Sequence, residues 1–213
     1  MYSNVNKIYA LLIANFMETC KIEIFIIEKL LINIDAKTKV CIDDNPQTKL
    51  IQFIQINELD KLEENNLFIL YFSGHGDRIG KRIDNKMEMI STWINIDDTF
   101  SYSYNIDKIL SKLNCKILLI SDSCYSGSFG KYYFGTSPLL FIGSSSINNK
   151  SREYVNSKEK RGILFYIFSE IINNLKNITL CEIKDIINKM ITKHKIKIKP
   201  VIKTFNINEQ ILE

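Results

Sequence analysis

Two short apolar runs, each ending in glycine and small polar residues, constrain the fold of this chain more than any other feature. The first run, NLFILYFSGHG, covers residues 66–76, and the second, CKILLISDSCYSG, covers residues 115–127. Continuous apolar runs of this length, bounded by turn residues, are typical of strands that are buried on both faces of a parallel sheet. Parallel strands need long crossover connections, which are usually helices. The sequence therefore predicts βαβ units built around one central sheet.

The other segments continue this alternation and predict an α/β fold with helices on both faces of a mainly parallel sheet of about six strands. Strands are expected at Lys7–Ala14, Lys39–Asp43, Asn66–Phe72, Lys116–Ile120, Leu139–Gly143 and Lys197–Phe205. Helices are expected at Met17–Ile34, from Asn45-Pro46 to Leu59, at Asn105–Leu113, at Gly162–Asn174 and from the capping box Thr179–Glu182 onward. The polar segment Ser144–Arg161 is expected to be a long loop.

Length and composition exclude several classes of protein. With 213 residues, we expect one domain over residues 1–213, and no prodomain before the first strand. Five cysteines without a CxxC pair argue against a disulfide framework or zinc site, and for a reducing, cytoplasmic location. A net charge of +4 without a basic run does not suggest nucleic-acid binding, and the apolar N-terminal run is too short to span a membrane. The oligomeric state is left open.

The two apolar runs carry residues that together suggest nucleophilic catalysis. His75 ends the first run and Cys124 the second, and the chain has only one other histidine, His194, which is expected to face solvent. A histidine can take the proton of a thiol, which otherwise is mostly protonated at neutral pH. Sites in open α/β sheets lie at the carboxyl ends of the strands, where both residues fall. A free cysteine is more often a core residue, as expected for Cys20, Cys41, Cys115 and Cys181.

The segments SGHG and DSCYSG resemble the catalytic motifs of caspase-like cysteine peptidases, more closely those of metacaspases and bacterial caspase-like enzymes than those of animal caspases. Positions 75 and 124 are 49 residues apart, close to the separation of about 50 that is typical of caspases. The likeness extends over roughly residues 7–206. It implies the caspase-like fold.

The resemblance also implies an activity and roles for single residues. The chain is expected to be a cysteine endopeptidase in which Cys124 is the nucleophile and His75 the general acid and base. Backbone N–H groups of Gly76 and Cys124 would form the oxyanion hole. Asp122 and Ser73 would line the S1 pocket, which receives the substrate side chain before the scissile bond (P1), here Arg or Lys. From the residues alone, Asp122 has the alternative of a loop acid in an Asx turn.

No organic cofactor and no obligatory metal are implied, and the expected partners are protein or peptide substrates. Asp97 and Asp98 lie where calcium-dependent metacaspases place part of an acidic ion site. Few other acids surround them, so a solvated turn is the better interpretation. Two alternatives stay open: the same dyad with a separase- or legumain-like specificity, and a catalytically weak homologue that acts as a regulatory or binding module. Basic residues within 148–162 add self-cleavage as a further hypothesis.

Overall fold

A six-stranded sheet forms the centre of the molecule, in the order β11-β8-β7-β3-β1-β2. The computed structural model describes residues 5–151, 153–156, 159–193 and 200–207. Every neighbouring pair of strands is parallel except β11 and β8, which are antiparallel. The predicted sheet is thereby confirmed. Its strands are β1 (Ile8–Ala14), β2 (Lys37–Ile42), β3 (Leu67–Ser73), β7 (Lys116–Asp122), β8 (Leu139–Gly143) and β11 (Val201–Phe205).

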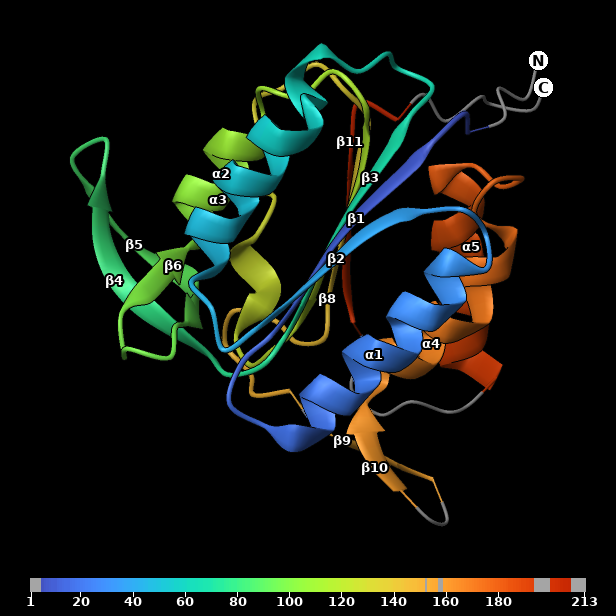
Figure 1. Ribbon diagram of the computed structural model, residues 1–213. Coiled ribbons are helices and arrows are strands. Elements are labelled where there is room, and N and C mark those ends of the chain that lie inside the picture. Colours follow the sequence, from blue (N-terminus) through green and yellow to red (C-terminus); the bar gives the residue numbers. More distant parts are fainter. Residues whose placement is uncertain (1–4, 152, 157–158, 194–199, 208–213) are drawn as a thin grey trace.

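Helices cover both faces of this sheet (Figure 1). On one face lie α1 (Glu18–Ile32), α4 (Ile163–Ile171) and α5 (Leu180–Lys193), and on the other α2 (Pro46–Asn57) and α3 (Ser103–Leu110). Because successive side chains of a strand point to opposite faces, the core consists of two clusters. Along β1, for example, Leu12 belongs to the cluster under α1 and α4, and Leu11 to the cluster under α2 and α3.

Local capping signals fix the starts of two helices as the sequence predicts. The Asn45 side chain accepts a hydrogen bond of 3.0 Å from the backbone N–H of Thr48, and Pro46 is the first residue of α2. At α5, the backbone N–H of Thr179 donates to the Glu182 carboxylate at 2.7 Å, and the N–H of Glu182 donates to the Thr179 hydroxyl at 3.2 Å. This reciprocal pair is the predicted capping box.

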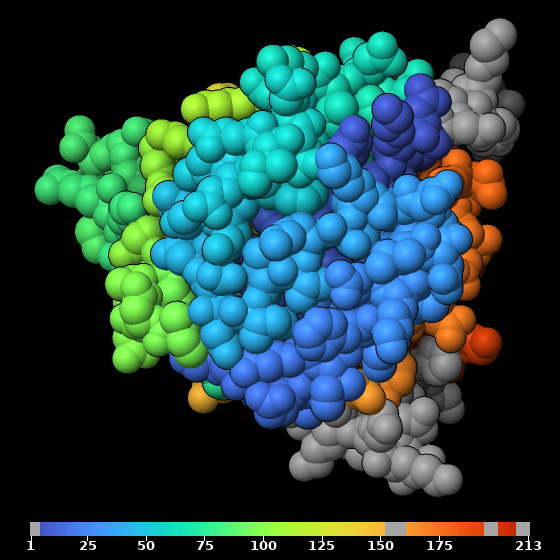
Figure 2. Space-filling view, viewed as in Figure 1, coloured from blue at the N-terminus to red at the C-terminus, as the bar shows by residue number. Residues whose placement is uncertain are grey.

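A second, three-stranded antiparallel sheet was not predicted. It consists of β4 (Gly76–Ile83), β5 (Lys86–Ile94) and β6 (Phe100–Tyr102), and the β4–β5 hairpin projects beyond α2 and α3 (Figures 1 and 2). Trp93 anchors this sheet to the core, because its ring stacks between Phe72 and Phe129, each with a centroid distance of 4.5 Å. Because β4 begins at Gly76, the small sheet starts at the residue directly after His75.

The turn between β5 and β6 contains Asp97 and Asp98, both exposed. The Asp97 carboxylate accepts hydrogen bonds from the backbone and side chain of Thr99, as in an ordinary solvated turn. Within the described part of the chain, no group of three or more His, Cys, Asp and Glu residues could hold a metal ion. Whether activity depends on calcium stays a prediction.

The prediction of a long loop over Ser144–Arg161 is partly wrong. This segment contains most of the antiparallel hairpin of β9 (Glu153–Asn156) and β10 (Glu159–Gly162). The hairpin lies beside the N-terminal end of α1 (Figure 1). Several other expectations lie outside the described residues: the exposure of His194, the start of the last strand before residue 200, and part of the 148–162 segment considered for self-cleavage. Among the helices that the structure describes, none is long and apolar enough to cross a membrane.

Candidate active site

The carboxyl ends of β3 and β7 lie side by side and start the two loops that carry His75 and Cys124. Ser73 and Asp122, the last residues of these strands, are partners in the parallel register. The N–H of Gly74 donates to the Asp122 carbonyl at 3.3 Å, so the pairing continues past the end of β3. His75 follows Ser73 by two residues and Cys124 follows Asp122 by two. The matched register therefore brings both loops to the same place on the sheet edge.

All four side chains that the sequence assigned to a site line one pocket. The pocket has a volume of about 380 Å³, and His75, Cys124, Ser73 and Asp122 are among its lining residues. His75 is exposed and Cys124 is half-buried, whereas Ser73 and Asp122 are only 2% and 7% exposed. The pocket thus has its thiol and imidazole near solvent, and a hydroxyl and a carboxyl group in its interior.

Gly76 is in direct contact with the loop of Cys124. A Cβ atom at position 76 would collide with the Cys124 carbonyl oxygen and the Ser123 side chain, so only glycine fits there. Ser123 is itself held in place, since its hydroxyl lies 2.9 Å from that of Ser121, which accepts a hydrogen bond of 2.8 Å from the Trp93 indole. The loops of His75 and Cys124 therefore form one packed unit.

The backbone after Cys124 turns sharply and is fixed on several sides. Tyr125 has a left-handed conformation with φ of 54°, its N–H donates to the carbonyl of Asn149 at 3.0 Å, and its carbonyl accepts a hydrogen bond from the Ser91 hydroxyl. The Arg78 guanidinium lies 5.1 Å from the centroid of the Tyr125 ring. These contacts define the direction in which the chain leaves Cys124.

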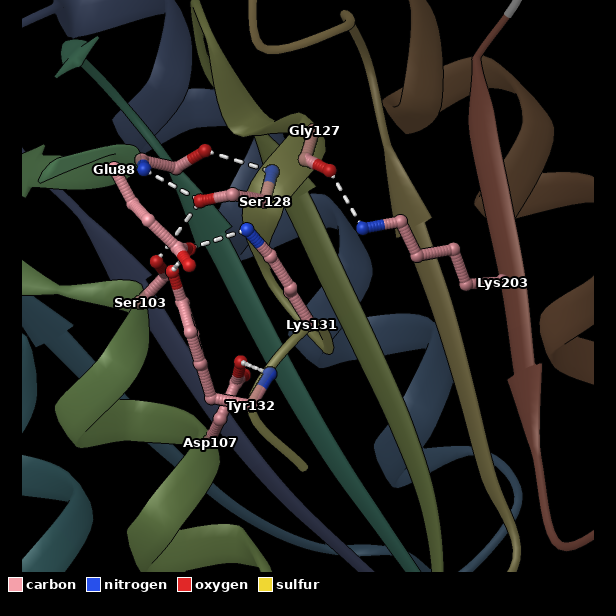
Figure 3. Close-up of polar contacts among 9 residues, drawn as sticks. Glu88, Ser103, Asp107, Gly127, Ser128, Lys131, Tyr132 and Lys203 are labelled. Carbon is pink, nitrogen blue, oxygen red and sulfur yellow. Dashed lines mark hydrogen bonds and ion pairs between the residues drawn. The ribbon is translucent and has the colours of Figure 1, made fainter. Parts of the chain in front are cut away.

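A half-buried lysine and a buried aspartate hold the next part of this loop (Figure 3). The Lys203 ammonium on β11 donates to the carbonyl of Gly127 at 2.6 Å, and the Asp107 carboxylate on α3 accepts from the N–H of Tyr132 at 3.0 Å. Burial raises the pKa of Asp107 to about 7, although its backbone hydrogen bonds and the charge of Lys203 oppose the rise. The loop after Cys124 is therefore stabilised from both sides by residues distant in sequence.

Glu23 on α1 is a pocket residue that the sequence analysis missed. Its side chain is 1% exposed, lines the same pocket, and accepts hydrogen bonds from the Gly162 N–H at 2.7 Å and the Ser73 hydroxyl at 3.4 Å. Burial, and secondly the charge of Asp122, raise the pKa of Glu23 to about 7. Two buried carboxyl groups thus share one pocket.

Asp122 has a structural contact as well as its place in the pocket. Its carboxylate accepts a hydrogen bond of 3.2 Å from the N–H of Leu164, in the first turn of α4, and a Cβ atom at Gly162 would collide with it. Burial raises the pKa of Asp122 to about 6, while hydrogen bonds from Ser144 and from the start of α4 oppose the rise. A carboxylate in a helix first turn interacts favourably with the helix dipole.

The other cysteines were all expected in the core. Cys41 and Cys115 are buried, but Cys181 is only half-buried, so this prediction holds for two of these three. Cys20 is 4% exposed and also lines the pocket. It therefore belongs to the site region as well as to the core, which the sequence interpretation did not recognise.

Comparisons with known proteins agree with this architecture. The chain matches the caspase domain family, Peptidase C14, over residues 9–198, whereas no curated protein matches it by sequence. Protein GSU0716 from Geobacter sulfurreducens has a similar structure, with a TM-score of 0.68, 15% identity and coverage of 95% of both chains. The Drosophila initiator caspase Dronc is similar with a TM-score of 0.62 and 11% identity, covering 97% of this chain and 82% of Dronc. The chain therefore belongs to the caspase domain family, which is a family of cysteine peptidases.

Proposed function

We propose that this protein is a cysteine endopeptidase that cleaves peptide bonds after Arg or Lys, with Cys124 as nucleophile and His75 as general acid and base. One observation carries the proposal: the thiol, the imidazole and two buried carboxyl groups line the same pocket. The first two are the groups that acyl transfer needs, and the carboxyl groups are suited to bind a cation.

The chemistry follows from the order of these groups. His75 takes the proton of Cys124, and the thiolate attacks the carbonyl carbon of the scissile peptide bond. Backbone N–H groups of Gly76 and Cys124 stabilise the negative oxygen. His75 then gives the proton to the leaving amine, which yields an acyl-enzyme. A water molecule, activated by His75, hydrolyses the thioester and restores the thiol.

Specificity for a basic P1 side chain is supported by the charges in the pocket. An ionised carboxylate in a buried site is unfavourable unless a positive partner is close. Arg161 also lines the pocket and its charge acts on Glu23, yet burial and Asp122 still raise the pKa of Glu23 to about 7. A P1 Arg or Lys would supply a further positive partner to Glu23 and Asp122. Arg is expected to be preferred, because its planar guanidinium can donate to both carboxylates at once. A P1 Asp would be repelled.

The dyad is tested by hydrolysis of a peptide with P1 Arg. Cys124→Ala should abolish turnover, and His75→Ala should lower kcat by about 10²- to 10⁴-fold, the usual contribution of general acid–base catalysis. Cys181→Ala is the matched thiol control and should keep wild-type activity. Peptidase activity in Cys124→Ala would contradict the assignment. A wild-type chain that hydrolyses nothing and is not labelled at Cys124 by a peptidyl electrophile would favour a regulatory or binding module.

Specificity is tested with matched peptides that carry Arg, Lys, Asp or Asn at P1. Asp122→Ala should lose about 2–5 kcal/mol of discrimination for the basic residues, the range found when one partner of a buried charge pair is removed. Glu23→Gln should lose a similar amount of this discrimination for basic residues. A wild-type preference for Asp or Asn would contradict the basic specificity but leave the dyad standing.

A further inference from the structure

Phe16, the second residue after β1, has a backbone conformation that its side chain disfavours. Its φ is +70°, in the left-handed region that glycine, asparagine and aspartate tolerate and bulky residues rarely adopt. The residue is half-buried, so its ring is not simply part of the core. Strained residues of this kind persist only where the surrounding structure holds them, and they concentrate at functional sites.

A chain of polar contacts holds Phe16 in this conformation. Its N–H donates to the Asp43 carboxylate at 2.8 Å, and the second oxygen of that carboxylate forms an ion pair of 2.8 Å with Lys21. The pKa of Asp43 is lowered by Lys21 and by the Phe16 N–H, so the carboxylate is charged at neutral pH. These contacts connect the ends of β1 and β2 with the first turn of α1.

The Phe16 ring lies against the imidazole of His75. The two ring centroids are 5.3 Å apart and the planes are tilted by 52°, a geometry typical of favourable aromatic pairs. The His75 side chain is exposed, and its imidazole forms no hydrogen bond with any residue that the structure describes. No carboxylate in that part of the chain therefore fixes its orientation.

We propose that Phe16 is a positioning residue that holds the His75 imidazole in the orientation needed to exchange a proton with Cys124. The inference rests on the proposed function and names the third member of the proposed Cys–His site. An exposed imidazole without a hydrogen-bond partner can rotate about two bonds, and proton transfer needs close alignment with the thiol. The aromatic contact restricts this rotation, and the strained backbone of Phe16 places the ring where the contact forms.

Phe16→Asn is the decisive variant, because asparagine tolerates positive φ and lacks the aromatic ring. We expect kcat to fall by about three- to tenfold, the equivalent of one aromatic pair, with an unchanged KM and a folded chain by circular dichroism. Phe16→Tyr should recover most of the lost activity. Glu58→Asn is the matched control: Glu58 also has positive φ, 49°, but it caps the end of α2 before β3 begins, whereas His75 follows β3. Its kcat should not change.

A second measurement needs no peptide substrate. The rate of Cys124 alkylation by iodoacetamide, followed across pH, reports how strongly the imidazole promotes thiolate formation. The profile of Phe16→Asn should shift from that of the wild type toward that of His75→Ala. Wild-type kcat and a wild-type alkylation profile in Phe16→Asn would overturn the inference. A fall in kcat in Phe16→Tyr as large as that in Phe16→Asn would overturn it as well. A wild-type chain with the His75-dependent profile but no peptidase activity would refute only the proposed function.

Discussion

Replacing Glu23 by glutamine tests whether burial in the pocket makes the ionised form of Glu23 unfavourable in the folded chain. Burial and the neighbouring Asp122 raise the pKa of Glu23 from 4.5 to about 7. At 1.36 kcal/mol per pKa unit, this rise means that the ionised form destabilises the folded chain by about 3 kcal/mol. Glutamine has nearly the same shape, and its amide oxygen can still accept the hydrogen bond from the Gly162 N–H. Glu23→Gln should therefore stabilise the protein at every pH at which Glu23 is ionised in the unfolded chain.

The sign and the pH range follow from the two pKa values of Glu23. Between 4.5, its ordinary value, and about 7, its value in the folded chain, the folded state binds more protons than the unfolded state. The free energy of unfolding of the wild type therefore falls as pH rises through this range. The advantage of Glu23→Gln should be close to zero at about pH 4, increase up to about pH 7, and approach 3 kcal/mol above it.

Urea unfolding of the two proteins at a series of pH values measures this difference directly. Both should carry Cys124→Ala, so that self-cleavage cannot interfere. Glu28→Gln is the matched control on the same helix, where the side chain is only half-buried, and should change the free energy of unfolding much less than Glu23→Gln. A difference between Glu23→Gln and the wild type that is the same at every pH, or a loss of stability at about pH 8, would refute the argument from burial.

Three further predictions follow from single contacts. The Tyr71 hydroxyl is buried and has no hydrogen-bond partner in the part of the chain that the structure describes, so Tyr71→Phe should raise the free energy of unfolding by about 1 kcal/mol in urea; a destabilised variant would reveal a partner. Gly76→Ala should abolish peptide hydrolysis in a folded chain, because its methyl group would displace Cys124, and a fully active variant would contradict this packing. Lys203→Met should lower kcat because the Gly127 carbonyl loses its donor, and Lys203→Arg should restore part of it; equal kcat values in both variants would argue against a role of the cation.

The central sheet could be predicted because its strands are buried on both faces. Every residue of β1, β3 and β7 is buried apart from Lys116 at the start of β7, so the apolar runs in the sequence coincide with the strands. The boundaries of β8 agree with the prediction for the same reason. Helix starts with local caps, such as the Thr179–Glu182 box, could also be predicted from the sequence, since all the groups involved lie within a few residues.

The small sheet escaped prediction because burial alternates irregularly along β4, which leaves no clear period of two. A local signal was nevertheless present. Asp84 and Asn85 connect β4 to β5 with φ of 46° and 64°, the pair of positive values that a two-residue type I′ hairpin needs. Asp and Asn adopt such values more readily than most residues. The turn could thus have been recognised even though the strands could not.

The residues of the candidate site also differed in whether the sequence could predict them. Ser73 and Asp122 are the last residues of two recognisable strands, and His75 and Cys124 follow them by two residues. Their meeting at one sheet edge could therefore be predicted from topology alone. The hydrogen bond between Glu23 and Gly162, in contrast, joins residues 139 positions apart, and no local pattern encodes it.

The position of Glu23 within α1 still contained a usable signal. The buried face of this helix consists of Cys20, Glu23, Ile24, Ile27 and Leu31, with the spacing of an apolar stripe in which one member is an acid. A carboxyl group on a buried face is unfavourable unless it has a partner or a function. Its hydrogen bonds to Ser73 and Gly162 satisfy the two oxygens, and the charge of Arg161, which also lines the pocket, lowers its pKa. Burial and the charge of Asp122 nevertheless outweigh these effects, so the pKa stays raised. Under the proposed specificity, the cation of a P1 arginine or lysine would lower this pKa further, and the acid in the stripe would serve substrate binding.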